Sequence, residues 1–287
     1  MKKKFILAMT LFGGLVFGGL AEEKELSEKE KRQLIRSYYD MAIRYFAEEK
    51  YSKAISYYEQ ILKLDPEQTQ SQQLIETCRY QMRLKLSGLL NEVRQLVSQG
   101  KYNSAGIKLK EALTNEPENT ELNDCWKKVD LVKNIFADFT ASDKAAELVR
   151  RSVAELWESP RGNARLMINA AIYASQIAPE DARLKKYLEV LEKNYPAEYR
   201  AVQIIPGMNL VDQKLVSALN YIYDSKYDQA ILECNDVLAL EPENILAYKR
   251  LGSAYYALKK EGEAKKIWRK ALRLAPNDEE LKMFLNQ

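Results

Sequence analysis

Apolar residues recur at helical spacing over most of this chain, with few interruptions. The pattern is clearest near the C-terminus, where it predicts one helix from about Ile245 to Leu258 and a second helix that ends at Leu274. The Lys-Glu-Gly sequence at residues 260–262 forms the turn between them, and Pro276 prevents the second helix from continuing. The segment is therefore predicted to be a helical hairpin.

Small and aromatic residues occupy the facing sides of this hairpin. Gly252 and Ala264 allow the two helices to approach closely, and Trp268 fills the space beside them. The pattern repeats at a step of 34 residues, from Pro242 to Pro276. Self-similarity of this length indicates stacked helical pairs.

The repeated unit resembles the tetratricopeptide repeat (TPR), a 34-residue helix–turn–helix with a large–small–aromatic first helix and an Ala–aromatic–Ala second helix before a proline. Further units fit before Pro66 and Pro117, and a degenerate unit ends at Pro179. The resemblance implies an all-α fold, a TPR-type helical solenoid with extra inserted helices. The matching residues of the first unit are Tyr38, Met41, Ala42, Tyr45, Ala54, Tyr58 and Ile61.

The N-terminal units are separated by more than the repeat length, so extra helices are predicted between them. One long helix is predicted between Pro66 and Gly100, and others at residues 121–139 and 179–194. At residues 195–209, Tyr-Pro and Pro-Gly pairs break the helical period and predict a domain boundary. We expect an irregular TPR-like array at residues 22–200. A TPR pair with a capping helix should follow at residues 201–287.

Residues 1–21 have the composition of an export signal. Three lysines precede an uncharged apolar run from Phe5 to Leu20, and acidic residues follow Ala21. Small residues at the expected positions favour cleavage after Ala21. The run holds four glycines and is shorter than the about 20 residues that a transmembrane helix needs. We predict a cleaved signal peptide and a periplasmic or secreted protein; anchoring to the inner membrane by an uncleaved segment is the alternative.

Charge and composition argue against several functions. The chain has 44 Lys and Arg against 41 Asp and Glu, and removal of the three leader lysines makes these numbers equal. This balance is not that of a general nucleic-acid binder. The chain has no His, the commonest general base and metal ligand, and no phosphate-loop or nucleophile motif. We expect no enzymatic activity, no cofactor and no metal site.

The three cysteines, Cys78, Cys125 and Cys234, allow two interpretations. An odd number in an exported chain is compatible with one disulfide and one free thiol. Each cysteine could instead be a small buried apolar side chain, which is what the helical pattern around Cys234 favours. A bridge between Cys78 and Cys125 stays open at this stage.

The resemblance implies a function in binding other proteins. The first helices of such repeats line a concave groove that holds partner segments. We therefore expect a scaffold or assembly factor with protein partners in the cell envelope, or alternatively a solenoid that binds glycan or peptidoglycan through its tyrosines. Membrane contact is expected only if the leader stays attached. The predicted groove residues are Arg36, Tyr39, Ile43 and Phe46 in the first unit, Leu215, Leu219 and Ile222 in the fourth, and Leu246, Lys249, Ser253 and Tyr256 in the fifth.

Overall fold

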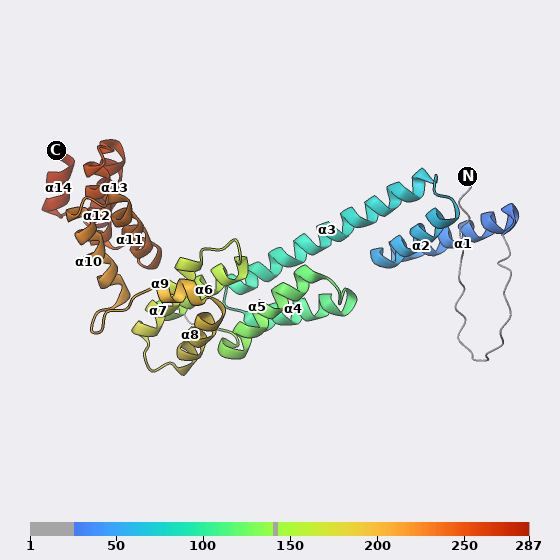
Figure 1. Ribbon diagram of the computed structural model, residues 1–287, viewed down its shortest axis with the longest axis horizontal. Helices are drawn as coiled ribbons and strands as arrows, with labels where there is room; N and C mark the ends of the chain where they lie inside the picture. The colour runs from blue at the N-terminus through green and yellow to red at the C-terminus, as the bar shows by residue number, and fades with distance from the viewer. Residues whose placement is uncertain (1–25, 140–142, 287) are drawn as a thin grey trace. The chain divides into compact units, whose positions relative to one another are not determined.

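A computed structural model describes residues 26–139 and 143–286 of the chain (Figure 1). Within these ranges the regular structure is entirely helical, which confirms the predicted all-α class. The predicted signal peptide at residues 1–21 lies outside the described residues. The helices are α1 (Glu28–Ala47), α2 (Tyr51–Leu64), α3 (Thr69–Ser98), α4 (Tyr102–Asn115), α5 (Thr120–Phe136), α6 (Lys144–Glu158), α7 (Ala164–Ile177), α8 (Ala182–Asn194), α9 (Pro196–Ala201), α10 (Leu210–Tyr223), α11 (Tyr227–Leu240), α12 (Ile245–Ala257), α13 (Glu261–Leu274) and α14 (Glu279–Asn286).

The chain forms two compact units that divide between Gly88 and Leu89, within the long helix α3. The boundary predicted near residues 195–209 therefore lies inside the second unit. Part of that segment is also more regular than predicted, because α9 begins at Pro196, where the fixed φ of proline suits the first helical turn. No helix in the described part of the chain combines the length and apolarity needed to cross a bilayer.

In the first unit, α1 and α2 form a closely packed hairpin. Ser27 and Glu30 cap α1 reciprocally, since each side chain accepts a hydrogen bond from the backbone N–H of the other residue. Ala42 and Ala54 are fully buried between the helices, and the ring of Tyr58 packs beside them. These residues occupy the core positions that the repeat pattern predicts.

In the second unit, four successive helix pairs pack as hairpins or neighbours: α4 on α5, α6 on α7, α10 on α11, and α12 on α13. Helix α14 packs on α13 and closes the series, as the predicted capping helix should. Helices α5 and α8 are the predicted insertions, and they contact each other. Helix α10 packs on α7 as well as on α11 and α12, so the C-terminal repeats continue directly from α7.

Four turns of the chain share one backbone geometry. The φ angle is positive at Glu49 (56°), Gly100 (76°), Ser225 (58°) and Lys259 (63°). In each case the next residue is a lysine with φ between −96° and −87° and ψ of 61–63°, and a helix follows. The turn between α6 and α7 lacks this geometry, in agreement with the degenerate sequence of that unit.

Candidate partner-binding groove

The C-terminal helices are held together by a core around Trp268 in α13. Its indole N–H donates a hydrogen bond to the backbone carbonyl of Lys249 in α12, with an N–O distance of 3.2 Å. Ala264 and Ala271 are fully buried on the same side of α13, and Leu281 of α14 completes the cluster. This core fixes α12, α13 and α14 to one another, and thereby sets which residues of the first helices stay accessible.

Among the predicted groove residues of the fourth unit, Leu215 is buried, with only 6% of its surface exposed. It belongs to the core, and its prediction as an accessible groove residue is wrong. The cause is the packing of α10, which contacts α7, α11 and α12 together. Leu219 and Ile222 are partly buried on the same helix. Their role in binding stays a prediction.

In the fifth unit, Lys249 pairs with the capping helix. Its ammonium nitrogen lies 2.7 Å from a carboxylate oxygen of Asp278 and 2.5 Å from one of Glu280. Burial disfavours the charged ammonium, but these two hydrogen bonds outweigh it and hold the pKa of Lys249 above its ordinary value. The pairing ties α12 to the start of α14, so Lys249 is already neutralised and is not a free cation for a partner.

Two of the other three predicted residues of α12, Ser253 and Tyr256, also make contacts within the fold. The hydroxyl of Ser253 donates to the carbonyl of Lys249 at 3.0 Å. The ring of Tyr256 lies 5.8 Å from that of Trp268, centroid to centroid, and is partly buried. The ring of Tyr256 therefore packs against the core around Trp268.

Two of the four predicted groove residues of the first unit are exposed, and the other two pack against neighbouring side chains. Arg36 is exposed, and Ile43 exposes 57% of its surface. Tyr39 is instead fixed by a 2.8 Å hydrogen bond with the hydroxyl of Ser71 and by edge contact with Tyr58. Phe46 likewise packs edge-on against a neighbouring tyrosine of α2. Of these four residues, only Arg36 and Ile43 are exposed.

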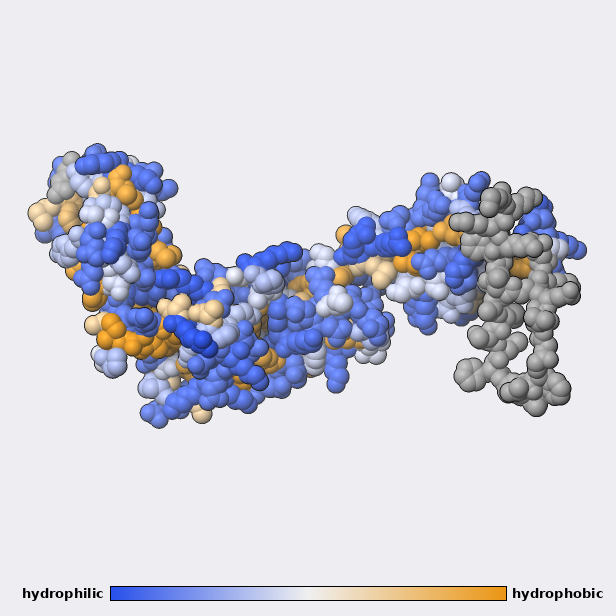
Figure 2. All heavy atoms as spheres, viewed as in Figure 1, coloured by the Kyte–Doolittle hydropathy of each residue, from blue (hydrophilic) through white to orange (hydrophobic). Residues whose placement is uncertain are grey.

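Exposed apolar residues occur on α10, on α12 and on the capping helix α14. Tyr223 of α10 exposes 77% of its surface, Leu246 of α12 exposes 43%, and Met283 of α14 exposes 59%. Figure 2 shows apolar patches among the mainly hydrophilic surface of this region. We call Tyr223, Leu246 and Met283 the exposed apolar set. Sequence reasoning missed Met283, although it occupies the position of Lys249 one repeat later.

Two family models, both described as tetratricopeptide repeat, match the chain. One covers residues 35–68, which contain most of α1 and all of α2, and the other covers residues 221–287, from the end of α10 onward. A comparison with curated proteins finds no match. The chain is a TPR protein. TPR domains mediate protein–protein interactions, and TPR proteins are typically non-enzymatic scaffolds, which is the general function that the repeats support here.

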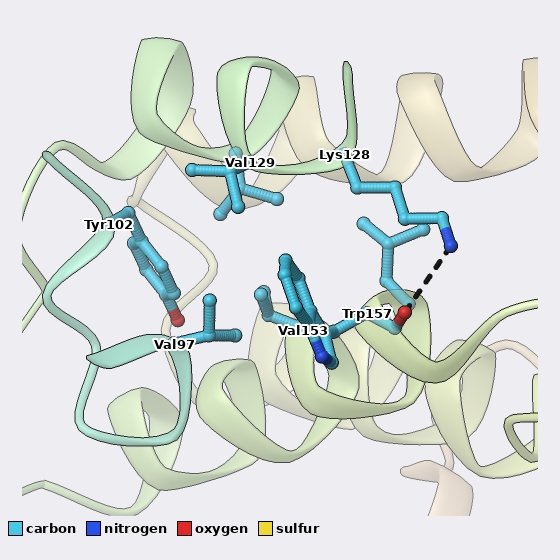
Figure 3. Close-up of a pocket in the computed structure, with 8 residues that line it drawn as sticks. Val97, Tyr102, Lys128, Val129, Val153 and Trp157 are labelled. Carbon is cyan, nitrogen blue, oxygen red and sulfur yellow. Dashed lines mark hydrogen bonds between the residues drawn. The ribbon is translucent and has the colours of Figure 1, made fainter. Parts of the chain in front are cut away.

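This TPR protein contains a small apolar pocket between α3, α4, α5 and α6 (Figure 3). It has room for about one water molecule. The hydroxyl of Tyr102 is buried at its edge without a hydrogen-bond partner. Lys128 donates to the carbonyl oxygens of Trp157 at 3.3 Å and Ser159 at 2.5 Å, which explains how its charge is accommodated beside the apolar wall. The pocket is too small for an organic ligand.

The cysteines of the TPR protein are free and buried, so Cys78 and Cys125 do not form the disulfide that the sequence left open. Burial raises the pKa of all three thiols, to about 11 for Cys125 and about 12 for Cys234. Because the thiolate is the reactive form, these side chains are packing residues rather than nucleophiles. In the described part of the chain, no group of three acidic or cysteine side chains is arranged to hold a metal ion.

Proposed function

We propose that this TPR protein is an exported scaffold or assembly factor that binds partner proteins of the cell envelope through its C-terminal repeats. The observation that carries the proposal is the exposed apolar set on α10, α12 and α14. Each of these three exposed apolar side chains is of the kind that anchors a partner protein at an interface. A few such anchors supply most of the binding energy at protein interfaces.

The fold supports this assignment by leaving these residues without a structural role. Met283 is exposed on α14, while Leu281, two positions earlier, is fully buried against α13. The buried side of the capping helix therefore completes the core, and its exposed side is not needed for folding. Tyr223 stands at the end of α10, where its ring extends into solvent.

Site-specific photo-crosslinking tests the proposed surface. A photoreactive phenylalanine analogue is placed at Tyr223 or Met283, and a control is placed at Arg269, an exposed position on α13. We expect both test positions to crosslink the same protein in envelope fractions and the control to give no such product. Equal crosslinking from all three positions, or none from either test position, would contradict the proposal. Retention of the protein on purified cell wall without crosslinked protein would favour glycan binding instead.

The export part of the proposal rests on the composition of residues 1–21 alone, with their lysines before an apolar run. Fractionation and N-terminal sequencing of the protein from cells test it. We expect a mature protein that begins at Glu22 and is released by osmotic shock. An N-terminus at Met1 on membrane-bound protein would favour the anchored alternative, and a cytoplasmic protein would contradict export.

A further inference from the structure

The solvent side of α13 carries a row of positive charge. Four exposed basic side chains recur there at spacings of three and four residues, so they share one side of the helix. Ala264, Trp268 and Ala271 are buried on the opposite side. We call the four residues the basic stripe: Lys266, Arg269, Lys270 and Arg273.

No member of the basic stripe forms an ion pair with a carboxylate in the part of the chain that the structure describes. Elsewhere the fold pairs an exposed cation with an acid one helical turn away, as in Lys31 with Glu28. In the stripe the residues one turn away are themselves basic, and like charges at this spacing repel each other. The ammonium of Lys270 lies 4.9 Å from the ring centroid of Tyr248, which positions this charge without neutralising it.

The repeat itself does not require this charge. The positions 34 residues earlier, on α11, are occupied by Leu232, Asn235, Asp236 and Ala239. Residues 259–274 contain seven Lys and Arg against two Glu, whereas the whole chain contains 44 Lys and Arg against 41 Asp and Glu. The near-equal totals of the chain therefore conceal a strongly basic surface on its last repeat, and folding does not explain that surface.

The arrangement of the stripe suits a broad anionic surface. Its four charges span about 10 Å along the helix, at a rise of about 1.5 Å per residue. This length is about one Debye length at 0.1 M salt, so an anionic surface attracts all four charges together. The stripe lies on a second helix of its repeat, whereas the groove that holds partner segments is lined by first helices. Its partner is therefore expected to lie against an open face rather than in a groove.

We propose that the basic stripe docks the protein on a membrane surface that carries anionic phospholipids. Lysine and arginine side chains next to such a surface are attracted to the lipid phosphates. Leu274 follows the stripe at the end of α13 and exposes 41% of its surface, which adds an apolar contact beside the cations. This docking uses a different helix from the exposed apolar set, and it does not need the leader at residues 1–21.

Flotation of the protein with lipid vesicles tests the proposal. The vesicles contain phosphatidylcholine alone or an equal mixture of phosphatidylcholine and phosphatidylglycerol. The stripe variant changes all four residues of the basic stripe to glutamine. We expect the wild type to bind the anionic vesicles more tightly than the neutral ones, and less tightly as salt is added. The stripe variant should bind the anionic vesicles about a hundredfold more weakly, since each Lys or Arg near an anionic surface contributes about fivefold.

A matched control removes four positive charges from other places. It changes four exposed lysines that also lack ion pairs, on α4, α5 and α8, to glutamine: Lys110, Lys127, Lys185 and Lys186. Both variants keep the same N-terminus as the wild type, so any difference between them reports the position of the charges. The control should bind the anionic vesicles like the wild type. A double variant, Arg269→Lys with Arg273→Lys, keeps the charge and should also bind.

Folding is checked separately by thermal melts. The stripe variant should melt at the temperature of the wild type or slightly above it, because it loses only exposed side chains that repel one another. Equal binding of the stripe variant and the wild type, or equal losses in the stripe variant and the control, would overturn the proposal. So would a wild type that does not bind anionic vesicles.

An acidic protein is the other partner that the charge would suit, and poly-glutamate is the probe for it. Stripe-dependent binding to poly-glutamate without binding to vesicles would overturn docking on lipid and indicate a protein contact instead. Crosslinking from Tyr223 and Met283 tests the proposed function on other helices, so either proposal can fail while the other holds.

Discussion

The backbone of Gly252 in α12 lies directly against the indole of Trp268 in α13. A Cβ atom added at position 252 would lie 2.1 Å from Trp268 Nε1 and 2.5 Å from its Cδ1, which is far inside van der Waals contact. The absence of a side chain at Gly252 is therefore what allows Trp268 to sit between the two helices and donate its hydrogen bond to Lys249.

We predict that Gly252→Ala destabilises the protein by about 1–3 kcal/mol, because the new methyl group over-packs a rigid, fully buried ring. Gly262→Ala is the matched control. A Cβ at position 262 meets nothing within 4 Å, and alanine is the better helix former. Urea titrations of both variants measure the effect. Equal stability of Gly252→Ala and the wild type would show that the two helices are less tightly packed than the structure indicates.

Trp268→Ala should cost about 3–5 kcal/mol, because it leaves a large cavity between α12, α13 and α14. The neighbouring exposed residue Arg269 provides the control, and Arg269→Ala should change stability by no more than about 0.5 kcal/mol. Thermal melts followed by circular dichroism at 222 nm, the usual helical signal, distinguish the two. A Trp268→Ala melt that matches the wild type would contradict the core assignment.

Asp236 joins the α6–α7 pair to the C-terminal repeats. Its carboxylate pairs with Lys214 at 2.7 Å and Arg165 at 2.5 Å, and also accepts from Asn169. We predict that Asp236→Ala costs about 1–3 kcal/mol, since it removes charge-assisted hydrogen bonds while Lys214 and Arg165 keep their ion pairs with Glu233. As a control, Lys226→Ala breaks an exposed ion pair and should cost less than about 1 kcal/mol. Equal losses of stability in Asp236→Ala and Lys226→Ala would show that the ion pairs of Asp236 contribute no more than an exposed ion pair.

Glu241 should make stability depend on pH. Burial alone would raise the pKa of its carboxyl, but hydrogen bonds from Lys144, Tyr173 and Asn244 outweigh burial and hold the pKa below its ordinary value of 4.5. Because the pKa of Glu241 is lower in the folded than in the unfolded protein, its carboxylate stabilises the fold fully above the ordinary value of 4.5. This contribution to stability is lost as the pH falls through the lower, folded-state pKa.

The test compares the wild type with Glu241→Gln, which keeps the shape of the side chain and removes its charge. The wild type should be more stable at pH 7, and the gap in unfolding free energy should narrow on going to about pH 3. Denaturant titrations at both values measure it. A gap that is the same at both pH values would mean that the Glu241 charge contributes nothing to folding.

The function of the exposed surface was only partly accessible to sequence reasoning. The repeat register placed the predicted groove on the first helices, but it treated each helix as if its neighbours were identical from unit to unit. Leu215 is buried on a helix that packs on α7, α11 and α12, and Lys249 is neutralised because acidic residues lie at the start of α14. Neither contact follows from the 34-residue pattern.

The sequence by itself determined the helices, their turns and the core of each hairpin. These depend on residues close along the chain, such as Gly252 and Trp268, whose spacing is imposed by helix geometry and repeated in each unit. Only the tertiary structure decided which first-helix side chains stay exposed, and that Nη1 of Arg250 is buried without a hydrogen-bond partner among the described residues. Those properties depend on contacts between helices far apart in the chain, where one added or tilted neighbour changes burial and charge pairing without changing the local pattern.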